Sequence, residues 1–170
     1  VSKIQASGIA EAGNGSNGTP APSLDRATIG EIVRYDLILR IPDGTRVVDG
    51  VLSDPLPTGM VYFAGSASFG GSVETLASSV TSTAVDIDGD RIDAGTLTTP
   101  AVGSGGLVRY TLPADYHVVA DGVDDTVTIT FHAQVVSGAA GDSRDNIGLF
   151  GYQDGAGGSQ PTVATNTARV

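Results

Sequence analysis

Residues 29–42 read IGEIVRYDLILRIP, and their alternation decides the fold class. Every second position is apolar, namely Val33, Tyr35, Leu37, Leu39 and Ile41. Charged side chains stand between them, at Arg34, Asp36 and Arg40. Because successive side chains of a β-strand point to opposite faces, a period of two predicts a strand with one buried face. Pro42-Asp43-Gly44 then predicts a turn, and residues 46–54 predict the returning strand.

Residues 126–135, TVTITFHAQV, repeat this alternation toward the other end of the chain. Val127, Ile129, Phe131, Ala133 and Val135 share one side, and the other side, which includes His132, is polar. Shorter apolar stretches separated by turn residues, together with 24 glycines, fill much of the remaining sequence. We therefore predict an all-β chain of about 8–10 strands, folded as one Greek-key β-sandwich domain over residues 1–170.

Four further segments have patterns of their own. Residues 8–27 are dense in Gly, Asn, Ser and Pro, which predicts a surface loop. Residues 79–99 predict two strands around an Asp-Gly turn. Residues 146–155 and 162–170 predict a terminal hairpin. No apolar run approaches the roughly 20 residues needed to span a bilayer, so we expect no direct membrane insertion. Because Val1 does not open a signal peptide, we also expect a fragment of a longer chain.

The segment 51–68, VLSDPLPTGMVYFAGSAS, places an acid beside two prolines within an apolar stretch. Proline lacks an amide proton and restricts the preceding residue to extended geometry, so residues 53–59 should be neither helix nor interior ladder. The sequence predicts a rigid connection with Asp54 at the rim of a hydrophobic layer. Asp54 would serve there either as a turn residue or as a reactive group.

Charge and composition exclude several function classes. Nine basic and nineteen acidic residues give a net charge of −10, which repels phosphate backbones, so we expect no nucleic-acid partner. The absence of cysteine excludes a disulfide framework and thiolate chemistry. The two histidines, His117 and His132, have no companion at metal-ligand spacing, and no serine stands in a nucleophile elbow. We do not expect an enzyme.

Residues 86–93, DIDGDRID, hold four acids around Gly89: Asp86, Asp88, Asp90 and Asp93. Alternating carboxylates at a glycine bend can surround a hard cation with oxygen ligands, and calcium is the cation they would take. The ordinary alternative is a turn whose aspartates face water, and turn chemistry alone is sufficient to explain Asp-Gly. We expect no other cofactor.

Three stretches in this order resemble the isopeptide-forming fimbrial-protein domains of bacterial surface proteins. Residues 27–45 are similar to that family's Ile-Gly-Glu/Asp-x-Val-x-Tyr strand, and residues 51–68 to its Asp-x-Leu-Pro-x-Gly-Leu-x-Tyr hinge. Residues 146–155 are similar to its closing Asn-Thr-Ala-x-Val-x-Tyr strand, although Ile147 and Gly148 replace Thr and Ala. The resemblance implies an immunoglobulin-like sandwich, strung in tandem along adhesins and pilus stalks.

The resemblance also implies a covalent bond in many members, in which a first-strand lysine joins a last-strand asparagine with help from an acid. Carried over, Lys3 is the nucleophile, Asp54 the acid and Asn146 the acceptor. Two alternatives stay open: Asn166 as acceptor, because TNTA reproduces the Asn-Thr-Ala triplet better, and Glu31 as acid. The plain interpretation is a solvated lysine, a turn aspartate and a loop asparagine.

The function expected from this resemblance is mechanical: a stalk or extender repeat of a secreted or cell-surface bacterial adhesin or fimbrial protein. Its partners would be neighbouring repeats of the same chain or like subunits. One alternative is a calcium-dependent module that binds carbohydrate or protein. Another is a filament subunit that assembles by strand addition, with residues 162–170 as donor strand.

Overall fold

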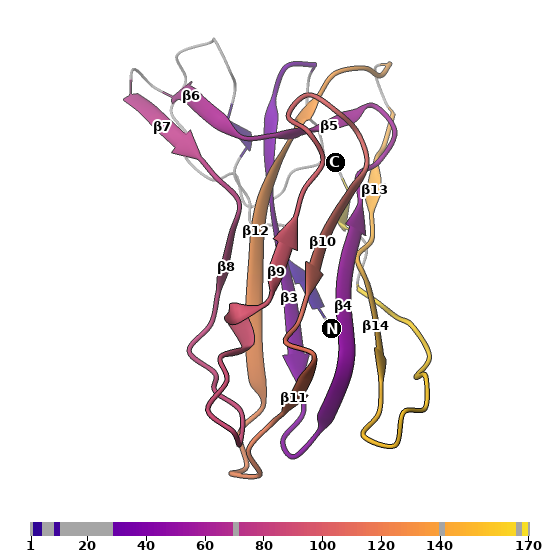
Figure 1. The fold of residues 1–170 in the computed structure, drawn as a ribbon. Helices are drawn as coiled ribbons and strands as arrows, with labels where there is room; N and C mark the ends of the chain where they lie inside the picture. Colours follow the sequence, from indigo (N-terminus) through magenta and orange to yellow (C-terminus); the bar gives the residue numbers. More distant parts are fainter. Residues whose placement is uncertain are drawn as a thin grey trace.

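The computed structural model describes residues 2–4, 9–10, 29–69, 72–139, 142–165 and 168–169. These residues form two facing antiparallel sheets, so the chain is an all-β sandwich as predicted (Figure 1). The first sheet has the order β1-β3-β12-β5, with β2 beside β3 and β8 beside β12. Its strands are β1 (Ser2–Ile4), β2 (Ile9–Ala10), β3 (Ile32–Ile41), β5 (Met60–Phe63), β8 (Ser79–Thr81) and β12 (Asp125–Val135).

The second sheet has the order β15-β14-β4-β10-β9, and β11 also pairs with β4. Its strands are β4 (Arg46–Pro55), β9 (Thr96–Thr98), β10 (Leu107–Thr111), β11 (Asp115–His117), β14 (Leu149–Gln153) and β15 (Val163–Ala164). Consecutive strands β3 and β4 lie in different sheets, as connections of a Greek-key sandwich do.

Two small ladders complete the described part: β6 (Gly65–Phe69) with β7 (Ser72–Leu76), and β13 (Asp145–Asn146) with β16 (Ala168–Arg169). A single 3-10 turn spans Ile92–Ala94. No helix in the described ranges is long and apolar enough to cross a membrane.

The core lies between the sheets, and the two strands read from alternation supply its centre. The five predicted apolar residues of β3 and the five of β12 are all buried. The two strands pair along ten registered positions, from Asp125 opposite Ile41 to Gln134 opposite Ile32. Tyr35 lies opposite Phe131, and their rings stack with centroids 5.3 Å apart. The period of two was therefore sufficient to place this half of the core.

The strands are more numerous than predicted, with sixteen in the described residues instead of 8–10. Ile9 and Ala10, within the predicted loop, pair with Val33 and Ile32. Segment 79–99 does contain two strands, but β8 and β9 join different sheets. Only an isolated bridge between Val85 and Arg91 flanks the Asp-Gly turn.

The prediction that residues 53–59 avoid an interior ladder was wrong for the first of them. Ser53 is paired on both sides, with Arg109 and Leu149, and Asp54 is paired with Val108. Strand β4 continues to Pro55, its last residue, which lies opposite Leu107. The ladder tolerates proline there because β14 pairs no further along β4 than Ser53, so an amide proton at Pro55 is not needed.

The outer neighbour of β14 is irregular. Val163 and Ala164 pair with Phe150 and Leu149, and a bridge joins Ser159 to Gln153. Pro161 stands between these two contacts. Within the predicted donor strand, residues 163–164 and 168–169 thus pair with β14 and β13 of their own chain.

Candidate functional site: a buried acid, amide and phenol

Asp54 lies in the middle of the second sheet and inside the sandwich. Its strand, β4, is hydrogen-bonded to both β10 and β14. Leu52 and Asp54 share the core-facing side of that strand, and the exposed fraction of Asp54 is 0%. The expected position at the rim of the layer was wrong, because β4 carries the acid into the core before the first proline ends the strand.

Asn146 lies on the short strand β13, which pairs with β16 through Asp145 opposite Arg169 and Asn146 opposite Ala168. Its exposed fraction is 1%. Neither atom of its side-chain amide has a hydrogen-bond partner among the described residues. A buried primary amide is normally hydrogen-bonded, so its burial at this position needs a specific explanation.

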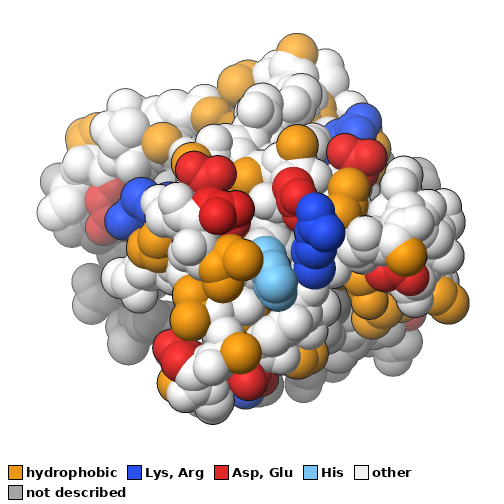
Figure 2. Space-filling view, turned by 60° about the horizontal axis from the view of Figure 1, so that its bottom comes forward, with side chains coloured by type: hydrophobic (Ala, Val, Ile, Leu, Met, Phe, Trp, Pro, Cys, Tyr) orange, Lys and Arg blue, Asp and Glu red, His pale blue; other side chains and the backbone are white. Residues whose placement is uncertain are grey.

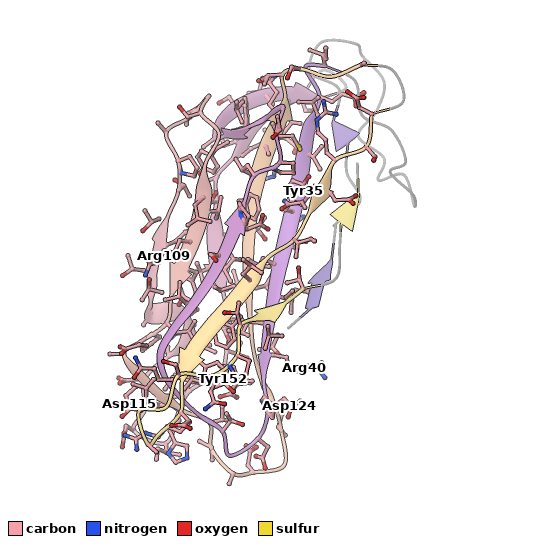
Figure 3. All side chains as sticks on the ribbon, turned by 90° about the vertical axis from the view of Figure 1, so that its right-hand side faces the viewer. Tyr35, Arg40, Arg109, Asp115, Asp124 and Tyr152 are labelled. Carbon is pink, nitrogen blue, oxygen red and sulfur yellow. The ribbon has the colours of Figure 1, made fainter. Side chains whose placement is uncertain are left out.

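Tyr35 is the residue through which the positions of Asp54 and Asn146 can be compared. The tyrosine is fully buried on β3, and its hydroxyl donates to Sδ of Met60 at 3.5 Å. Burial raises the pKa of Tyr35, and the Asp54 carboxylate raises it further, whereas the Asn146 amide and Arg144 lower it. Asp54 and Asn146 therefore both lie close enough to this hydroxyl to shift its pKa. Figure 3 shows Tyr35 on β3, with Arg109 on the opposite side of the sandwich.

Strand β1 places Lys3 opposite Leu37 of β3, two residues from Tyr35. Gly148, two residues after Asn146, approaches the same leucine. A Cβ atom built at Gly148 would lie 2.6 Å from Cδ1 of Leu37 and 3.2 Å from Cγ2 of Thr165. Glycine at position 148 therefore has a physical reason, because the family's alanine would collide with this leucine.

The alternative acid and acceptor lie differently. Glu31 is buried, but it stands just before β3 and precedes Leu37 by six residues. At about 3.3 Å per residue, its backbone lies roughly 20 Å from the position opposite Lys3. Asn166 lies outside the described residues, and so does the side chain of Lys3.

The four aspartates of 86–93 are not gathered around one point. Oδ1 of Asp86 accepts from the amides of Asp88 at 3.0 Å and Asp90 at 2.8 Å. Asp93 pairs with Arg91, which lowers the pKa of Asp93 through a hydrogen bond. Asp88 and Asp90 are exposed. In the described part of the chain, no group of three acidic or histidine side chains converges as metal ligands.

The lower end of the sandwich is acidic all the same. Figure 2 shows carboxylates and exposed hydrophobic side chains around a histidine at this end. Arg46 forms a two-point ion pair with Asp115, with its Nη2 atom 2.6 Å from Oδ2. Arg40 lies 3.9 Å from Asp124 (Figure 3). These contacts join neighbouring strands and loops to one another.

An open groove crosses the outer face of the second sheet, away from the buried cluster. Val51 and Ser53 of β4 and Leu149 and Gly151 of β14 line it. The loop that contains Ser159 and Gln160 also contributes lining residues. The groove is shallow, and its mixed lining indicates no particular chemistry.

Sequence reasoning missed two residues of this region, Tyr35 and Arg144. The alternation of β3 placed Tyr35 in the core without giving its hydroxyl a role. Arg144 stands in GDSRDN, a segment that predicts only a loop. Its effect on the pKa of Tyr35 and its contacts with the hinge are visible only in three dimensions.

No protein-family model matches this sequence, and neither does any curated protein. Solved structures with a similar fold do exist. The major pilin SpaD from Corynebacterium diphtheriae aligns with a TM-score of 0.56 and 11% identity, over 99% of this chain and 33% of that one. The pilus backbone protein RrgB from Streptococcus pneumoniae aligns with a TM-score of 0.54 and 17% identity, over 96% of this chain and 78% of that one.

The C-terminal domain of the AgI/II polypeptide BspA from Streptococcus agalactiae aligns with a TM-score of 0.57 and 13% identity. That alignment covers 99% of this chain and 48% of the other. The chain spans about a third (34%) of the length of the BcpA pilin structures from Bacillus cereus that it also matches. At these identities the likeness concerns the fold, and the chain has the β-sandwich fold found in bacterial pilins.

Proposed function

We propose that this chain is a structural domain of a bacterial surface fibre, a stalk or extender repeat whose sandwich is closed by a covalent bond between Lys3 and Asn146. The observation that carries the proposal is the cluster around Tyr35. It brings a fully buried acid, Asp54, near a fully buried amide, Asn146, in an otherwise apolar core. The register of β1 sets the only lysine of the sequence opposite Leu37, beside this cluster.

The proposed reaction is an amide exchange without an external reagent. The neutral Nζ of Lys3 attacks Cγ of Asn146, the Nζ–Cγ bond forms and the Cγ–Nδ2 bond breaks. Asp54, protonated, polarises the Asn146 carbonyl, and its carboxyl group then relays a proton from the amine to the departing Nδ2, which leaves as ammonia. The carboxyl group ends as it began, so the chain modifies itself once and turns over no substrate.

Burial and position would drive the reaction. An apolar interior disfavours charge, so it favours the uncharged forms of both an amine and a carboxylic acid, as the mechanism requires. Groups held on rigid strands react as though at very high effective concentration. A bond between the first strand and β13 would enclose nearly the whole chain, and it would stop the sandwich from opening strand by strand.

The fold that this chain shares with pilins supports the fibre role, an extracellular location, and neighbouring repeats or like subunits as partners. The two alternative functions are the calcium-dependent binding module and the filament subunit. Among the described residues, no specific contact supports either of them. The aspartates proposed for calcium are engaged in a turn and an ion pair. Residues 163–164 and 168–169 of the proposed donor strand are paired within their own chain.

Intact-mass measurement on the denatured protein tests the covalent bond. We expect a mass lower than that of the sequence by one ammonia, and the full mass in Lys3→Arg and Asn146→Ala. Because Lys3 is the only lysine, trypsin should release residues 1–26 joined to residues 145–169. That second peptide contains both candidate acceptors, so Asn166→Ala is needed as a matched variant, and it should keep the bond. An unchanged wild-type mass would refute the cross-link.

A further inference from the structure

Arg144 joins β13, the acceptor strand that contains Asn146, to the proline hinge at residues 55–59. It stands two residues before Asn146, and its Nε donates to the carbonyl oxygen of Thr58 at 3.2 Å. Its Nη2 donates to the carbonyl oxygen of Ser137, just beyond the end of β12. One guanidinium group therefore bridges the hinge, the exit of β12 and the entry to β13. A planar fork with several donors suits such a bridge better than an ammonium group.

Two glycines make room for this guanidinium. Gly59 has φ +84°, and a Cβ built there would lie 3.0 Å from both Nε and Nη2 of Arg144 and 2.7 Å from the Ser137 oxygen. A Cβ built at Gly138, where φ is +153°, would overlap the guanidinium itself. The glycine of the hinge therefore has a specific reason: it turns with positive φ, and it leaves space for an arginine from a distant segment.

The hinge is rigid, so it can fix the position of Thr58 relative to Asp54. Pro55 and Pro57 fix two backbone φ angles between Asp54 and Thr58, and the Met60 amide closes the turn by donating to the Pro57 carbonyl. The Val136 amide donates to the Gly59 carbonyl, which ties the turn to the exit of β12. The Thr58 oxygen held by Arg144 is therefore fixed relative to the Asp54 backbone.

The acceptor strand β13, in contrast, is held by few backbone pairs. In the described part, β13 has only Asp145 and Asn146, and both pair with β16 alone. A strand this short does not by itself fix a side chain to the tolerance that a reaction requires. A misplacement of about 1 Å can cost about 100-fold in rate.

We propose that Arg144 is a positioning residue for the cross-linking reaction: it holds the start of β13 against the hinge and thereby sets Asn146 relative to Asp54. This inference rests on the proposed function. It assigns a role to the guanidinium bridge that neither the strand pattern nor the hinge motif contains. Arg144 touches neither reacting atom, and it acts through the backbone on both sides of the site.

The test measures the rate at which full-length chain loses ammonia. Protein is made by cell-free synthesis, samples are quenched in denaturant at intervals, and intact masses give the cross-linked fraction. Arg144→Gln should slow the reaction about 10- to 100-fold. Arg109→Gln is the matched control, since Arg109 is an exposed arginine on β10. Lysine is not used at 144, because it would add a second amine close to Asn146.

A second pair of variants reaches the bridge from the hinge side. Gly59→Ala should displace the guanidinium and reproduce the slow rate. Gly65→Ala is its control, because Gly65 also has positive φ, +146°, but a Cβ there meets nothing within 4 Å. A wild-type rate in Gly59→Ala would overturn the inference.

The Lys3→Arg background, where no cross-link can form, distinguishes positioning by Arg144 from mere stabilisation of the fold. There Arg144→Gln should leave the melting temperature close to that of Lys3→Arg alone. A slow reaction accompanied by loss of the folded state in this background would show that Arg144 only stabilises the fold, and would overturn positioning. A wild-type rate in Arg144→Gln would overturn this inference alone. Absence of ammonia loss from the wild-type chain would refute the proposed function, and this inference with it.

Discussion

Asp54 and Asp86 are both buried, with exposed fractions of 0% and 4%, yet their surroundings differ. Asp86 lies in a turn at the lower end, where its carboxylate accepts from the amides of Asp88 and Asp90 and, at 3.5 Å, of His117. Asp54 faces the interior of the sandwich, near a phenol and a primary amide. One carboxylate accepts hydrogen bonds from backbone amides, and the other lies inside the core, close enough to a tyrosine to shift its pKa.

The hydrogen-bond partners of a buried aspartate distinguish a structural role from a reactive one better than its exposed fraction does. Backbone amides that donate to a carboxylate fix the shape of a turn, which suits a structural aspartate. An apolar core with neighbouring side chains favours the neutral acid, which can donate a proton. An aspartate beside Gly or Pro is ambiguous in the sequence, and its hydrogen-bond partners decide which role it takes.

The largest expected effect is at Asp54. Asp54→Asn should abolish the cross-link, and the melting transition should then match that of Lys3→Arg. By analogy with the closure of a loop of this size by a disulfide, the loss should be about 5 kcal/mol. Intact mass and denaturant unfolding provide the measurements. Glu31→Gln is the control and should retain the bond; full ammonia loss in Asp54→Asn would place the acid elsewhere.

Replacing the turn carboxylate should cost less. Asp86→Ala leaves backbone donors of the turn without an acceptor, so we expect a loss of about 1–3 kcal/mol in denaturant unfolding, with the cross-link intact. Asp86→Asn keeps an acceptor oxygen and should lose below about 1 kcal/mol. If Asp86→Ala altered the ammonia loss, the two carboxylates would not be separate in function.

His132 is a third buried polar group, and it lies outside the surroundings of both Asp54 and Asp86. Burial lowers the pKa of His132, Arg34 lowers it further, and Asp36 opposes them. The unfolded chain therefore binds a proton more readily than the folded chain does, so stability should fall as pH drops below about 6.5, the ordinary histidine value.

Urea unfolding at a series of pH values measures this slope. His132→Gln should flatten this slope. A slope that persists in His132→Gln would mean that another group is responsible for it.

Calcium should have the smallest effect. Asp86 and Asp93 already have hydrogen-bond partners, so we expect no change in melting temperature between calcium and a chelator. A rise that scales with calcium concentration would show a site on the native state and would favour the binding-module alternative. Asp88→Asn/Asp90→Asn would then locate it.

Much of the fold could be predicted because two strands are amphipathic over ten or more residues. The alternation of β3 and β12 identified ten core residues. Alternation also indicated that the side of β12 containing His132 is polar, which is correct, but not that His132 itself is buried. Strands of two or three residues, such as β2, β13 and β15, are too short for a period to be read.

The candidate site could be predicted only as a list of residues. The hinge motif identified Asp54, but a proline signals the end of a strand without saying how far the strand extends into the core. The motif contained Gly59, but not the arginine whose approach requires it. Contacts between segments some 80 residues apart leave no local pattern, and Arg144 with Thr58 is such a contact.

The proline at position 161 matters for how copies of this domain would tolerate crowding. Between its two contacts with β14, the outer segment of the second sheet presents a residue that cannot donate a backbone hydrogen bond. An uninterrupted outer strand is a template on which another chain can add. An outer margin interrupted by proline would let sandwiches lie alongside one another at high density without joining into a continuous sheet.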